Sequence, residues 1–290
     1  MLGLEILTLY AAWDWSASGP SEFRGASALE YVRRVVAYGP RPPGSEAIGR
    51  LREYLIAELK QLGWEVCQDA FTANTPLGRL EMVNLIARRP GSSGRAVAVT
   101  GHYDTKWMPG IRFVGANDGG SSTAFLLELA RALRARPLRN EIYLVFFDGE
   151  EAFEQWSEKD GVYGSRHLAA RWAADGTLRR LKALINVDMI GDRDLGILSE
   201  MNSTPWLRKL IWQVAADLGL DRYFLDEPAW IEDDHVPFLR YGAAAVNLID
   251  FHYGPRNSYW HTEEDTLDKL SAQSFQVVGR VVLETLARLE

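Results

Sequence analysis

Three carboxylates follow one strongly apolar segment in the middle of the chain. Residues 142–147 are all aliphatic or aromatic, which is typical of a strand buried on both faces, and the segment stops at Asp148, Glu150 and Glu151. Acids crowded at one strand end repel each other, so we expect a metal ion or a proton to be held there. The metal ion is the hypothesis that the other residues must support.

The other candidate ligands are histidines and aspartates next to further apolar segments: His102, Asp118, Asp188 and His261. A catalytic zinc ion typically takes three protein ligands from His, Asp and Glu and keeps one position open. Asp118, Glu151 and His261 could form such a trio, with separations of 33 and 110 residues. Because these separations match no local motif such as HExxH, the fold would have to assemble the site.

Glu150 and Glu151 are neighbours in the chain, which allows them different tasks. Side chains of adjacent residues in extended or loop backbone diverge. One carboxylate can therefore bind the metal while the other faces the substrate as a general acid and base. A nearby cation and partial burial would set the pKa of the second carboxylate. The two residue types alone leave open which carboxylate does which.

The elements that must position these residues alternate between strand and helix. Apolar patterns predict strands at residues 65–72, 80–87, 96–100, 141–147, 184–189 and 243–249. Steps of three and four predict helices at residues 25–38, 48–62, 125–133, 165–172, 207–218 and 275–289, and a short helix that ends at residue 241. We expect one α/β domain over residues 1–290, with residues 1–22 as a loosely attached N-terminal extension.

This alternation predicts a three-layer sandwich with a central, mixed, mostly parallel, twisted sheet flanked by helices. Ligands of such sheets collect at the carboxyl ends of the strands. The residues on or just after those ends are His102, Asp118, Glu151, Asp188 and His261. The fold hypothesis and the metal hypothesis therefore select the same residues.

The composition argues against several kinds of partner. The net charge is -7, from 32 basic and 39 acidic side chains without a basic tract, so we expect no nucleic-acid partner. The apolar start of the chain contains Glu5 and is too short to span a bilayer, so no membrane span is expected. Cys67 is the only cysteine, which excludes an intrachain disulfide and a cysteine-rich zinc site. We expect Cys67 to pack as a small hydrophobic residue.

Six segments in chain order are more specific than any single residue: VTGHYDTK, FVGANDGG, FFDGEEAFEQWSEKDGVYGSRHLA, NVDMIG, EDDHVPFLRYG and YWHTEEDTLDKL. Together they resemble the motifs of the glutaminyl-peptide cyclotransferases of animal and bacterial type. That family lies within the zinc-dependent exopeptidase fold of the M28 aminopeptidases. The likeness runs from about Phe23 to the C-terminus. Residues 146–169 are the most specific, because the WSxxDxxYGSRHLA part goes beyond the general aminopeptidase pattern.

The resemblance implies an activity and a metal site. One zinc ion would be held by Asp118, Glu151 and His261, Glu150 would be the acid and base, and Asp148 would support the strand end. The implied substrates are peptides or proteins with N-terminal glutamine, with glutamate as a second candidate. The α-amine of the glutamine would attack its own side-chain amide, which gives pyroglutamate and ammonia.

The resemblance also implies the surroundings of the metal. Asp188 and Asp233 would belong to the hydrogen-bond network of the active site, and Trp156 and Trp260 would be walls of the substrate pocket. The loop at residues 250–259 is longer than in the animal enzymes, so its aromatic residues, Phe251 and Tyr253, receive no assigned role. The resemblance alone favours an extracytoplasmic location, and we expect a monomer.

Two other functions stay open at this stage. With the zinc trio, His102 and Asp188 complete the set with which di-zinc aminopeptidases of this fold hold two metals, Asp118 bridging. They would either surround a single zinc site or hold a second ion. The alternative enzyme is thus an M28-type aminopeptidase, in which Glu150 activates a metal-bound water. The third function is a non-catalytic binding module, against which the intact ligand positions argue.

Several of these residues also have a structural interpretation. Asp118 could cap the following helix, Trp260 could belong to the core, and Asp233 could lie in a solvated turn. For His167 and His235, which lie in helical context, we favour structural roles.

Overall fold

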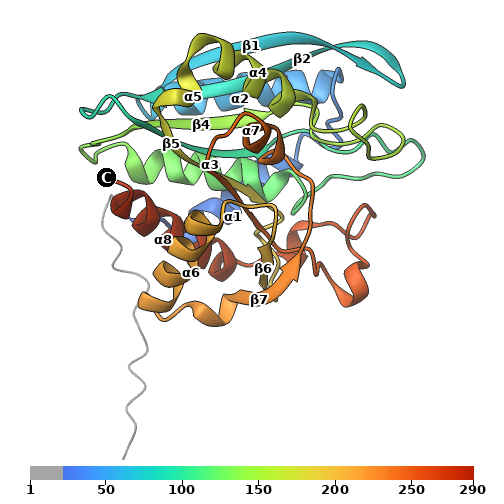
Figure 1. Cartoon of the computed structure of the whole chain (residues 1–290). Helices are drawn as coiled ribbons and strands as arrows, with labels where there is room; N and C mark the ends of the chain where they lie inside the picture. The colour runs from blue at the N-terminus through green and yellow to red at the C-terminus, as the bar shows by residue number, and fades with distance from the viewer. Residues whose placement is uncertain (1–21) are drawn as a thin grey trace, which may run out of the picture.

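A twisted six-stranded sheet forms the middle layer of the protein, whose residues 22–290 are described by a computed structural model (Figure 1). Its strands are β1 (Glu65–Thr75), β2 (Gly78–Arg89), β3 (Ala96–His102), β4 (Glu141–Phe147), β5 (Leu181–Asp188) and β8 (Ala245–Ile249). They lie in the order β1-β2-β4-β3-β5-β8. The pairs β1·β2 and β2·β4 are antiparallel, and the pairs β3·β4, β3·β5 and β5·β8 are parallel. The predicted mixed, mostly parallel sheet is confirmed.

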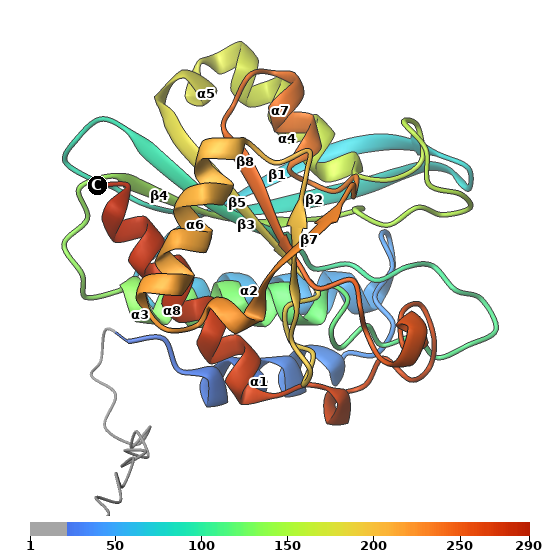
Figure 2. The same ribbon diagram turned by 60° about the horizontal axis from the view of Figure 1, so that its bottom comes forward.

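Helices cover both faces of this sheet, as Figures 1 and 2 show from two directions. One face packs against α1 (Gly25–Val36), α2 (Glu46–Gln61), α3 (Gly120–Leu133), α6 (Pro205–Asp217) and α8 (Ala272–Arg288). The other face packs against α4 (Tyr163–Asp175) and α7 (Val236–Arg240), with α5 (Thr177–Arg180) next to α4. The predicted three-layer sandwich is therefore also confirmed.

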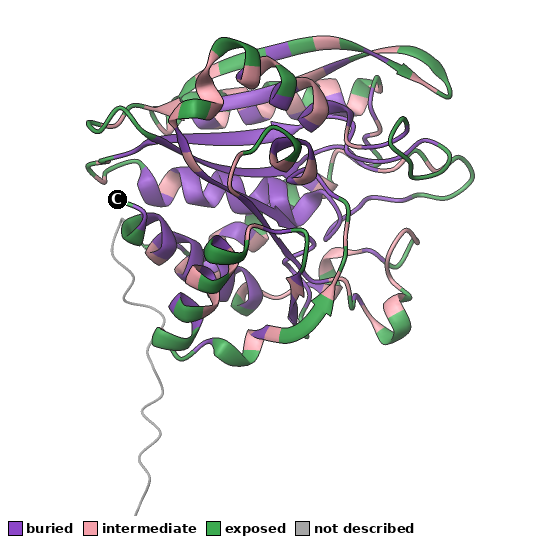
Figure 3. Cartoon of the chain, viewed as in Figure 1, coloured by how far each residue is buried: buried purple, intermediate pink, exposed green. Residues whose placement is uncertain are grey.

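The two faces of the sheet bury alternate residues of the same strand. In β4, Leu144 and Phe146 belong to the larger core beneath α3, whereas Val145 and Phe147 belong to the smaller core beneath α4 and α7. Both faces are thus covered, and the central strands are buried along their length (Figure 3). This double burial explains why the segment at residues 142–147 is continuously apolar rather than alternating.

The carboxyl ends of the parallel strands meet at one edge of the sheet. Long loops follow β3, β4 and β8 there and emerge on the right side of Figure 1. Since β3 ends at His102, β4 ends before Asp148 and β5 ends at Asp188, this edge collects the residues with candidate chemistry. The fold therefore positions the site at the strand ends, as expected from the sequence.

Some elements are not predicted by the apolar periodicity. A second, two-stranded parallel sheet joins β6 (Ile197–Glu200) to β7 (Phe224–Ala229), and it lies beside β8. The strand β6 has four residues, and β7 carries two exposed acids and Pro228, so neither shows a clear period. Short 3-10 turns at Asp221–Tyr223, Pro255–Asn257 and Leu267–Lys269 complete the connections.

Two predictions concern the N-terminal extension and a membrane-spanning helix. Residues 1–21, which make up nearly all of the proposed N-terminal extension, lie outside the described residues. Within residues 22–290, no helix is both long and apolar enough to cross a bilayer.

The prediction for Cys67 is wrong. Its side chain is exposed on β1, an edge strand that is only partly covered by α4. Edge positions of this kind leave small residues in contact with solvent even where the strand alternates regularly.

Candidate active site

Two groups of potential metal ligands meet at Asp118, just before α3. In the group that we name the outer triad, His261 Nε2 lies 3.1 Å from Asp118 Oδ2 and 3.2 Å from Glu151 Oε1. In the inner triad, His102 Nε2 lies 3.3 Å from Asp118 Oδ1 and 3.2 Å from Asp188 Oδ1. Within each triad the ligand atoms all lie within 4.8 Å of one another. The structure thus brings together the five residues that the strand ends select.

The two triads differ in their access to solvent. The three residues of the outer triad all line one cavity, which we name the central cavity, and the His261 side chain is 17% exposed. His102 of the inner triad is 1% exposed and does not line this cavity. An ion in the outer triad would therefore face the cavity directly, which the open position of a catalytic metal requires.

Asp118 is held through its backbone by a distant segment. The N–H groups of Asn117 and Asp118 donate to Asp265 Oδ1 at 2.8 Å and Oδ2 at 3.1 Å, and the Tyr253 hydroxyl donates to Asp265 Oδ1 at 2.6 Å. Asp265 follows His261 by four residues. One segment therefore supplies a potential metal ligand, His261, and also fixes the backbone of another, Asp118. The Tyr253 side chain is buried, with its hydroxyl bonded to Asp265, and it does not line the central cavity.

The interpretation of Asp118 as a helix cap is wrong. The N-cap residue of α3 is Gly119, and the Asp118 side chain caps no N–H group of the helix. Gly119 has φ 75°, and a Cβ atom there would lie 2.4 Å from the Asp104 carbonyl oxygen. Only glycine fits this close approach without strain, and the Asp118 side chain is left free to face the two histidines.

Asp104 positions the two adjacent glutamates. Its carboxylate accepts the Glu150 N–H at 3.2 Å and the Glu151 N–H at 3.4 Å. Asp148, at the end of β4, accepts hydrogen bonds from Arg52 Nη2 at 3.0 Å and the Val83 N–H at 2.8 Å, and is fully buried. It supports the strand end, as predicted, while the turn after it carries the two glutamates to the cavity.

One buried cation lies behind the site. Arg41 is fully buried and donates from Nε to the Tyr103 carbonyl at 2.9 Å, from Nη1 to Val114 at 2.5 Å and from Nη2 to Gly115 at 2.9 Å. These bonds tie together both ends of the loop that connects β3 to Asp118. Burial lowers the pKa of Arg41 to about 10, while nearby carboxylates, Asp104 first, oppose this shift.

The cluster shifts the pKa values of its members strongly. Burial raises the pKa of Glu150 well above its usual range; the charge on His102 opposes this shift, and Glu151 adds to it. Burial disfavours the charged form of His261, but Glu151 and Asp118 outweigh burial and raise the pKa of His261 to about 10. Burial likewise raises the pKa of Asp188 to about 7, against the effect of His102. Positive charge is therefore stabilised at this site, and additional negative charge is disfavoured.

The central cavity has a volume of about 560 Å³ and largely aromatic side walls. Trp260 stacks on the His261 ring with centroids 3.9 Å apart and an interplanar angle of 22°, and the Phe251 ring meets Trp260 edge-on at 5.0 Å. Both Trp260 and Phe251 line the cavity and are partly exposed. Trp260 therefore lines the cavity and is not a fully buried core residue, and Phe251 lines the cavity beside it; the substrate-binding role of Trp260 stays a prediction.

Trp156 lines the same cavity, and its role as a wall of the substrate pocket stays a prediction. It is exposed, and its Nε1 donates to Glu232 Oε2 at 3.4 Å. Its ring lies over Gly161, where a Cβ atom would be 3.2 Å from the indole. With φ 125°, Gly161 holds a conformation that other residues rarely adopt. A side chain at residue 161 would therefore crowd the indole of Trp156.

Asp188 and Asp233 both line the central cavity. Asp233 is buried and accepts hydrogen bonds from Asn186 Nδ2 at 3.1 Å and Asn247 Nδ2 at 2.6 Å. The interpretation of Asp233 as part of a solvated turn is therefore wrong. Two strands, β5 and β8, supply the asparagines that orient it.

The two helical histidines lie outside the central cavity. His235 Nε2 lies 3.0 Å from Glu200 Oε2, and both residues are fully buried. His167 stacks on Phe71 and lies 3.3 Å from Asp69. These are structural contacts, as favoured from the sequence.

The residues present suit a metal ion. Asp118 Oδ2 is buried and has no hydrogen-bond partner among residues 22–290. Imidazole nitrogens and carboxylate oxygens together form a donor set that zinc commonly accepts. His261 adopts a left-handed backbone with φ 54°, which is uncommon outside glycine and which tends to persist where function requires it. The buried Asp118 oxygen and the left-handed backbone of His261 both favour a metal ion at the outer triad.

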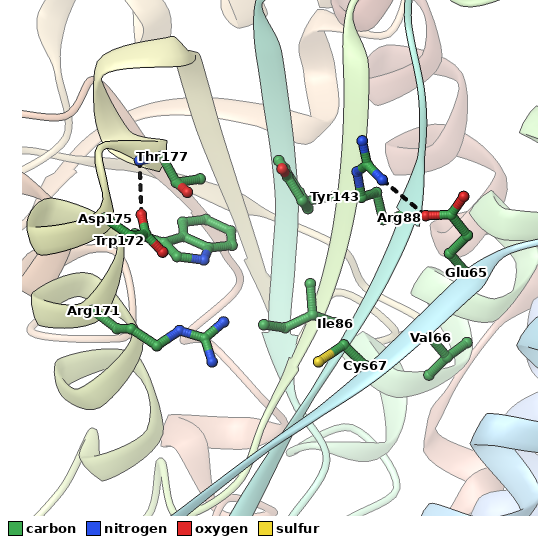
Figure 4. A pocket seen from close by; sticks show the side chains of 10 residues that line it. All are labelled: Glu65, Val66, Cys67, Ile86, Arg88, Tyr143, Arg171, Trp172, Asp175 and Thr177. Carbon is green, nitrogen blue, oxygen red and sulfur yellow. Dashed lines mark hydrogen bonds and ion pairs between the residues drawn. The ribbon is translucent and has the colours of Figure 1, made fainter.

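Another cavity, of about 400 Å³, lies between β1 and α4 (Figure 4). Its cations are already paired: Arg88 contacts Glu65 at 2.8 Å and Glu141 at 2.7 Å, and Arg171 contacts Asp69 at 2.5 Å. The exposed Cys67 lines it, and no potential metal triad of the described residues does. The chemistry is therefore concentrated in the central cavity.

Several residues of the site are missed by sequence reasoning. Asp104 lies two residues after His102, and Asp265 lies four after His261, so both belong to segments that the motifs single out. Lys106 and Glu232 also line the cavity and stand at the ends of two such segments, VTGHYDTK and EDDHVPFLRYG, whereas Trp230 lines it without a comparable signal. Trp230 and Glu232 follow β7, which the periodicity does not predict.

Comparisons with known proteins bear on this geometry. Residues 84–286 match the model of peptidase family M28. The glutaminyl-peptide cyclotransferase of Drosophila melanogaster is 35% identical over 252 residues, which cover 78% of this chain and 70% of the fly protein. The crystal structure of an Acidobacteriales bacterium glutaminyl cyclase has a TM-score of 0.90 and 42% identity, covering 94% of this chain and 97% of that one. A Zn-dependent exopeptidase from Parabacteroides distasonis has a TM-score of 0.81 and 26% identity, covering 92% and 99%.

Proposed function

The chain belongs to peptidase family M28 and to its glutaminyl-peptide cyclotransferase branch, and from this premise we propose that it converts N-terminal glutamine of peptides to pyroglutamate. The reaction forms a bond between the α-amine nitrogen and the side-chain amide carbon of the same residue. It breaks the bond from that carbon to the amide nitrogen, which leaves as ammonia. The observation that carries the proposal is the outer triad, which opens onto an aromatic-walled cavity next to Glu150.

We assign one zinc ion to Asp118, Glu151 and His261, because these three residues line the cavity. A zinc ion bound there would polarise the side-chain carbonyl group of the glutamine and stabilise negative charge on its oxygen. The Trp260 ring, stacked on His261, holds the imidazole plane, and Asp265 holds the backbone of Asp118. These supports keep the proposed ligands in place, and Trp260 in addition lines the cavity.

Glu150 is the group that we assign to proton transfer. Glu150 is 7% exposed, and its Oε2 lies 4.0 Å from His102 Nδ1. Burial raises the pKa of Glu150 above its usual range, which makes the carboxyl group a better proton acceptor than an ordinary glutamate. Glu150 takes one proton from the attacking amine and delivers it to the amide nitrogen, so that ammonia leaves uncharged.

The cavity walls account for the remaining requirement, which is to hold amine and amide of one residue in a folded arrangement. Trp156 and Trp260 both line the cavity with flat apolar surfaces. Asp188 and Asp233 extend the polar floor between them and complete the network assigned to the active site. Because the walls hold the substrate in the folded arrangement, less entropy is lost during the cyclisation step itself. The walls also limit the access of water.

The test is ammonia release from a glutamine-initiated dipeptide amide, measured together with metal content. We expect activity with about one zinc per chain, loss of activity with a chelator, and recovery on addition of zinc. An alanine-initiated dipeptide amide serves as the control and should release no ammonia from its first residue. Zinc-loaded protein that leaves the glutamine peptide unchanged would refute the proposal.

The inner triad supports a second candidate function. His102, Asp118 and Asp188 form a complete second set of potential ligands, as a di-zinc aminopeptidase would need. Two zinc ions per chain, with hydrolysis of leucine- or alanine-initiated peptides, would favour this candidate.

The extracytoplasmic location and the monomeric state stay predictions of the family resemblance. Size-exclusion chromatography with light scattering tests the monomeric state.

A further inference from the structure

We propose that Glu154 and Glu232, at the mouth of the central cavity, make this enzyme prefer peptides whose second residue is cationic. The inference rests on the proposed cyclotransferase function and names its substrate class. It concerns arginine or lysine directly after the N-terminal glutamine.

Two segments form the mouth of the cavity. The loop after β4 supplies Glu154 and Trp156, and the segment after β7 supplies Trp230 and Glu232; all four line the cavity and are exposed. The proposed metal ligands and Glu150 lie deeper and are at most partly exposed. A glutamine held at Glu150 must therefore pass its peptide bond outward between these two segments.

The position of the first residue is restricted by an independent observation. Glu150 is more than nine-tenths buried and lines the cavity, and its Oε2 lies 4.0 Å from His102 Nδ1. Because 4.0 Å is longer than a hydrogen bond, this buried carboxylate can still accept a donor from a ligand or water, and the substrate amine supplies one. With the amine at Glu150, the second residue of the peptide reaches the level of the mouth.

The mouth carries two carboxylates without an ion pair among the described residues, and a cation on the adjoining surface, Lys159, shares its cavity with Asp160 as well as Glu154. Neither Glu154 nor Glu232 forms an ion pair in the described part of the chain, and the contact of Glu232 is the Trp156 indole N–H. Lys106 also lines the cavity, but its Nζ donates to the Ala152 carbonyl at 2.7 Å and lies 3.7 Å from Glu151 Oε2. The lysine is therefore engaged next to the metal site.

An adjoining cavity continues the path of the substrate. It also has a volume of about 560 Å³ and shares Glu154, Gln155 and Trp156 with the central cavity. Its far side is the tip of the β1–β2 hairpin, at residues 74–76. A peptide that leaves the central cavity along this route passes Glu154, so the carboxylate borders the chain after the first residue.

A cationic second residue fits this mouth in two ways. Its charge is attracted by the two carboxylates, and a guanidinium group can also lie over the exposed indole of Trp156 or of Trp230, which is 71% exposed. Exposed ion pairs are weak, so we expect a preference of about three- to tenfold in kcat/KM over alanine. A second-residue glutamate should be disfavoured to a similar degree.

The experiment compares kcat/KM for ammonia release from Gln-Arg-amide, Gln-Ala-amide and Gln-Glu-amide with the zinc-loaded enzyme. The expected order is arginine, alanine, glutamate. The ratio of the first to the second should shrink as NaCl rises from 0.05 to 0.5 M, because salt screens exposed charges.

Variants connect the preference to the two residues. In Glu154→Gln and Glu232→Gln the arginine-to-alanine ratio should fall toward one, and in Glu154→Lys the glutamate peptide should gain on the arginine peptide. The amide oxygen in Glu232→Gln can still accept the Trp156 N–H. Glu53→Gln, on the exposed face of α2 and outside the central cavity, removes the same charge and should keep the wild-type ratio.

The outcomes separate this inference from the function on which it rests. Equal kcat/KM for the three peptides, or a ratio that stays unchanged in both glutamine variants, overturns the cationic preference while the cyclotransferase function stands. Absence of ammonia from all three peptides with zinc-loaded enzyme overturns the function, and this inference with it.

Discussion

The outer triad and the Glu200–His235 pair are built from the same kinds of side chain, but their carboxylates differ in the hydrogen bonds that they accept from the surrounding backbone. Glu200 Oε1 accepts the N–H groups of Asn202 and Ile231, and Oε2 accepts the Ser203 N–H as well as contacting His235. Asp118 Oδ2 contacts His261 but accepts no hydrogen bond in the described part of the chain. Backbone N–H groups therefore saturate the structural pair, whereas the triad leaves a buried oxygen for a ligand.

The pKa shifts show the same contrast. Burial alone would raise the pKa of Glu200, but His235 and the surrounding donors outweigh burial and lower it to about 2. Burial raises the pKa of Glu151, and the charge of Asp118 raises it further, against the effect of His261. A carboxylate–histidine contact is thus a structural element when donors surround it. It is a candidate metal site when a second carboxylate competes for the same imidazole.

The largest effect should come from Asp118→Asn, which changes the residue shared by both triads. A neutral amide is a weaker ligand than a carboxylate, so we expect zinc to be lost and kcat/KM for a glutamine peptide to fall by about 10⁴-fold. Metal analysis and the ammonia assay check this, with the thermal unfolding midpoint as the control for folding. A variant that keeps zinc and full activity would show that the open oxygen is not a ligand.

Glu150→Gln should separate proton transfer from metal binding. We expect kcat to fall by about 10³-fold, because an amide cannot accept the amine proton, while the zinc content stays at the wild-type value. Asp104 can still accept the two backbone N–H groups of the turn, so the geometry should persist. Unchanged kcat would remove Glu150 from the mechanism, and simultaneous zinc loss would make it a ligand instead.

His261→Ala and His102→Ala divide the two triads. Removing His261 takes one of three ligands from the triad that lines the cavity, so we expect zinc loss and a fall in activity of about 10²-fold or more. Removing His102 should leave one zinc bound and reduce activity less. If the His102 variant loses one of two zinc ions and the wild type binds two, the inner triad holds a metal and the aminopeptidase candidate gains support.

The smallest effect should come from Glu200→Gln, which tests the structural pair. The folded pKa of about 2 lies below the usual value of 4.5, so ionised Glu200 stabilises the fold above pH 4.5 and loses this contribution as pH falls through 2. We expect the wild type to exceed the variant by about 2 kcal/mol at pH 7 and by less near pH 3.

Urea unfolding of both proteins at each pH measures this difference. Zinc content in Glu200→Gln should equal that of the wild type, because Glu200 belongs to neither triad. A variant that unfolds normally but binds no zinc would break the distinction between the two kinds of carboxylate–histidine contact.

The location of the site could be predicted from the sequence because the fold has parallel strands. Polar residues after the apolar segments at 96–100, 141–147 and 184–189 meet at one edge, whatever the exact bounds of the strands. The roles of Trp156 and Trp260 as walls came only from the family resemblance. Periodicity contains no information about which aromatic rings line a cavity.

Other features depend on tertiary contacts that leave no local pattern. The bonds that saturate Glu200 come from residues 202, 203, 231 and 235, and the strand β6 that carries it has only four residues. The mouth residues Trp230 and Glu232 follow β7, whose register is irregular. The exposure of Cys67 could not be predicted, because the sequence of an edge strand does not reveal how far the neighbouring helix covers it.

The clamp between Asp265 and the backbone of Asp118 spans 147 residues of sequence. During synthesis, a chain that has grown past β5 already contains Asp118, Glu151 and the inner triad. It still lacks His261 and the carboxylate that holds the Asn117–Asp118 turn. The outer triad can therefore form only after the segment beyond β8 has emerged and docked. Zinc uptake at the outer triad would then mark a molecule whose C-terminal segment has docked.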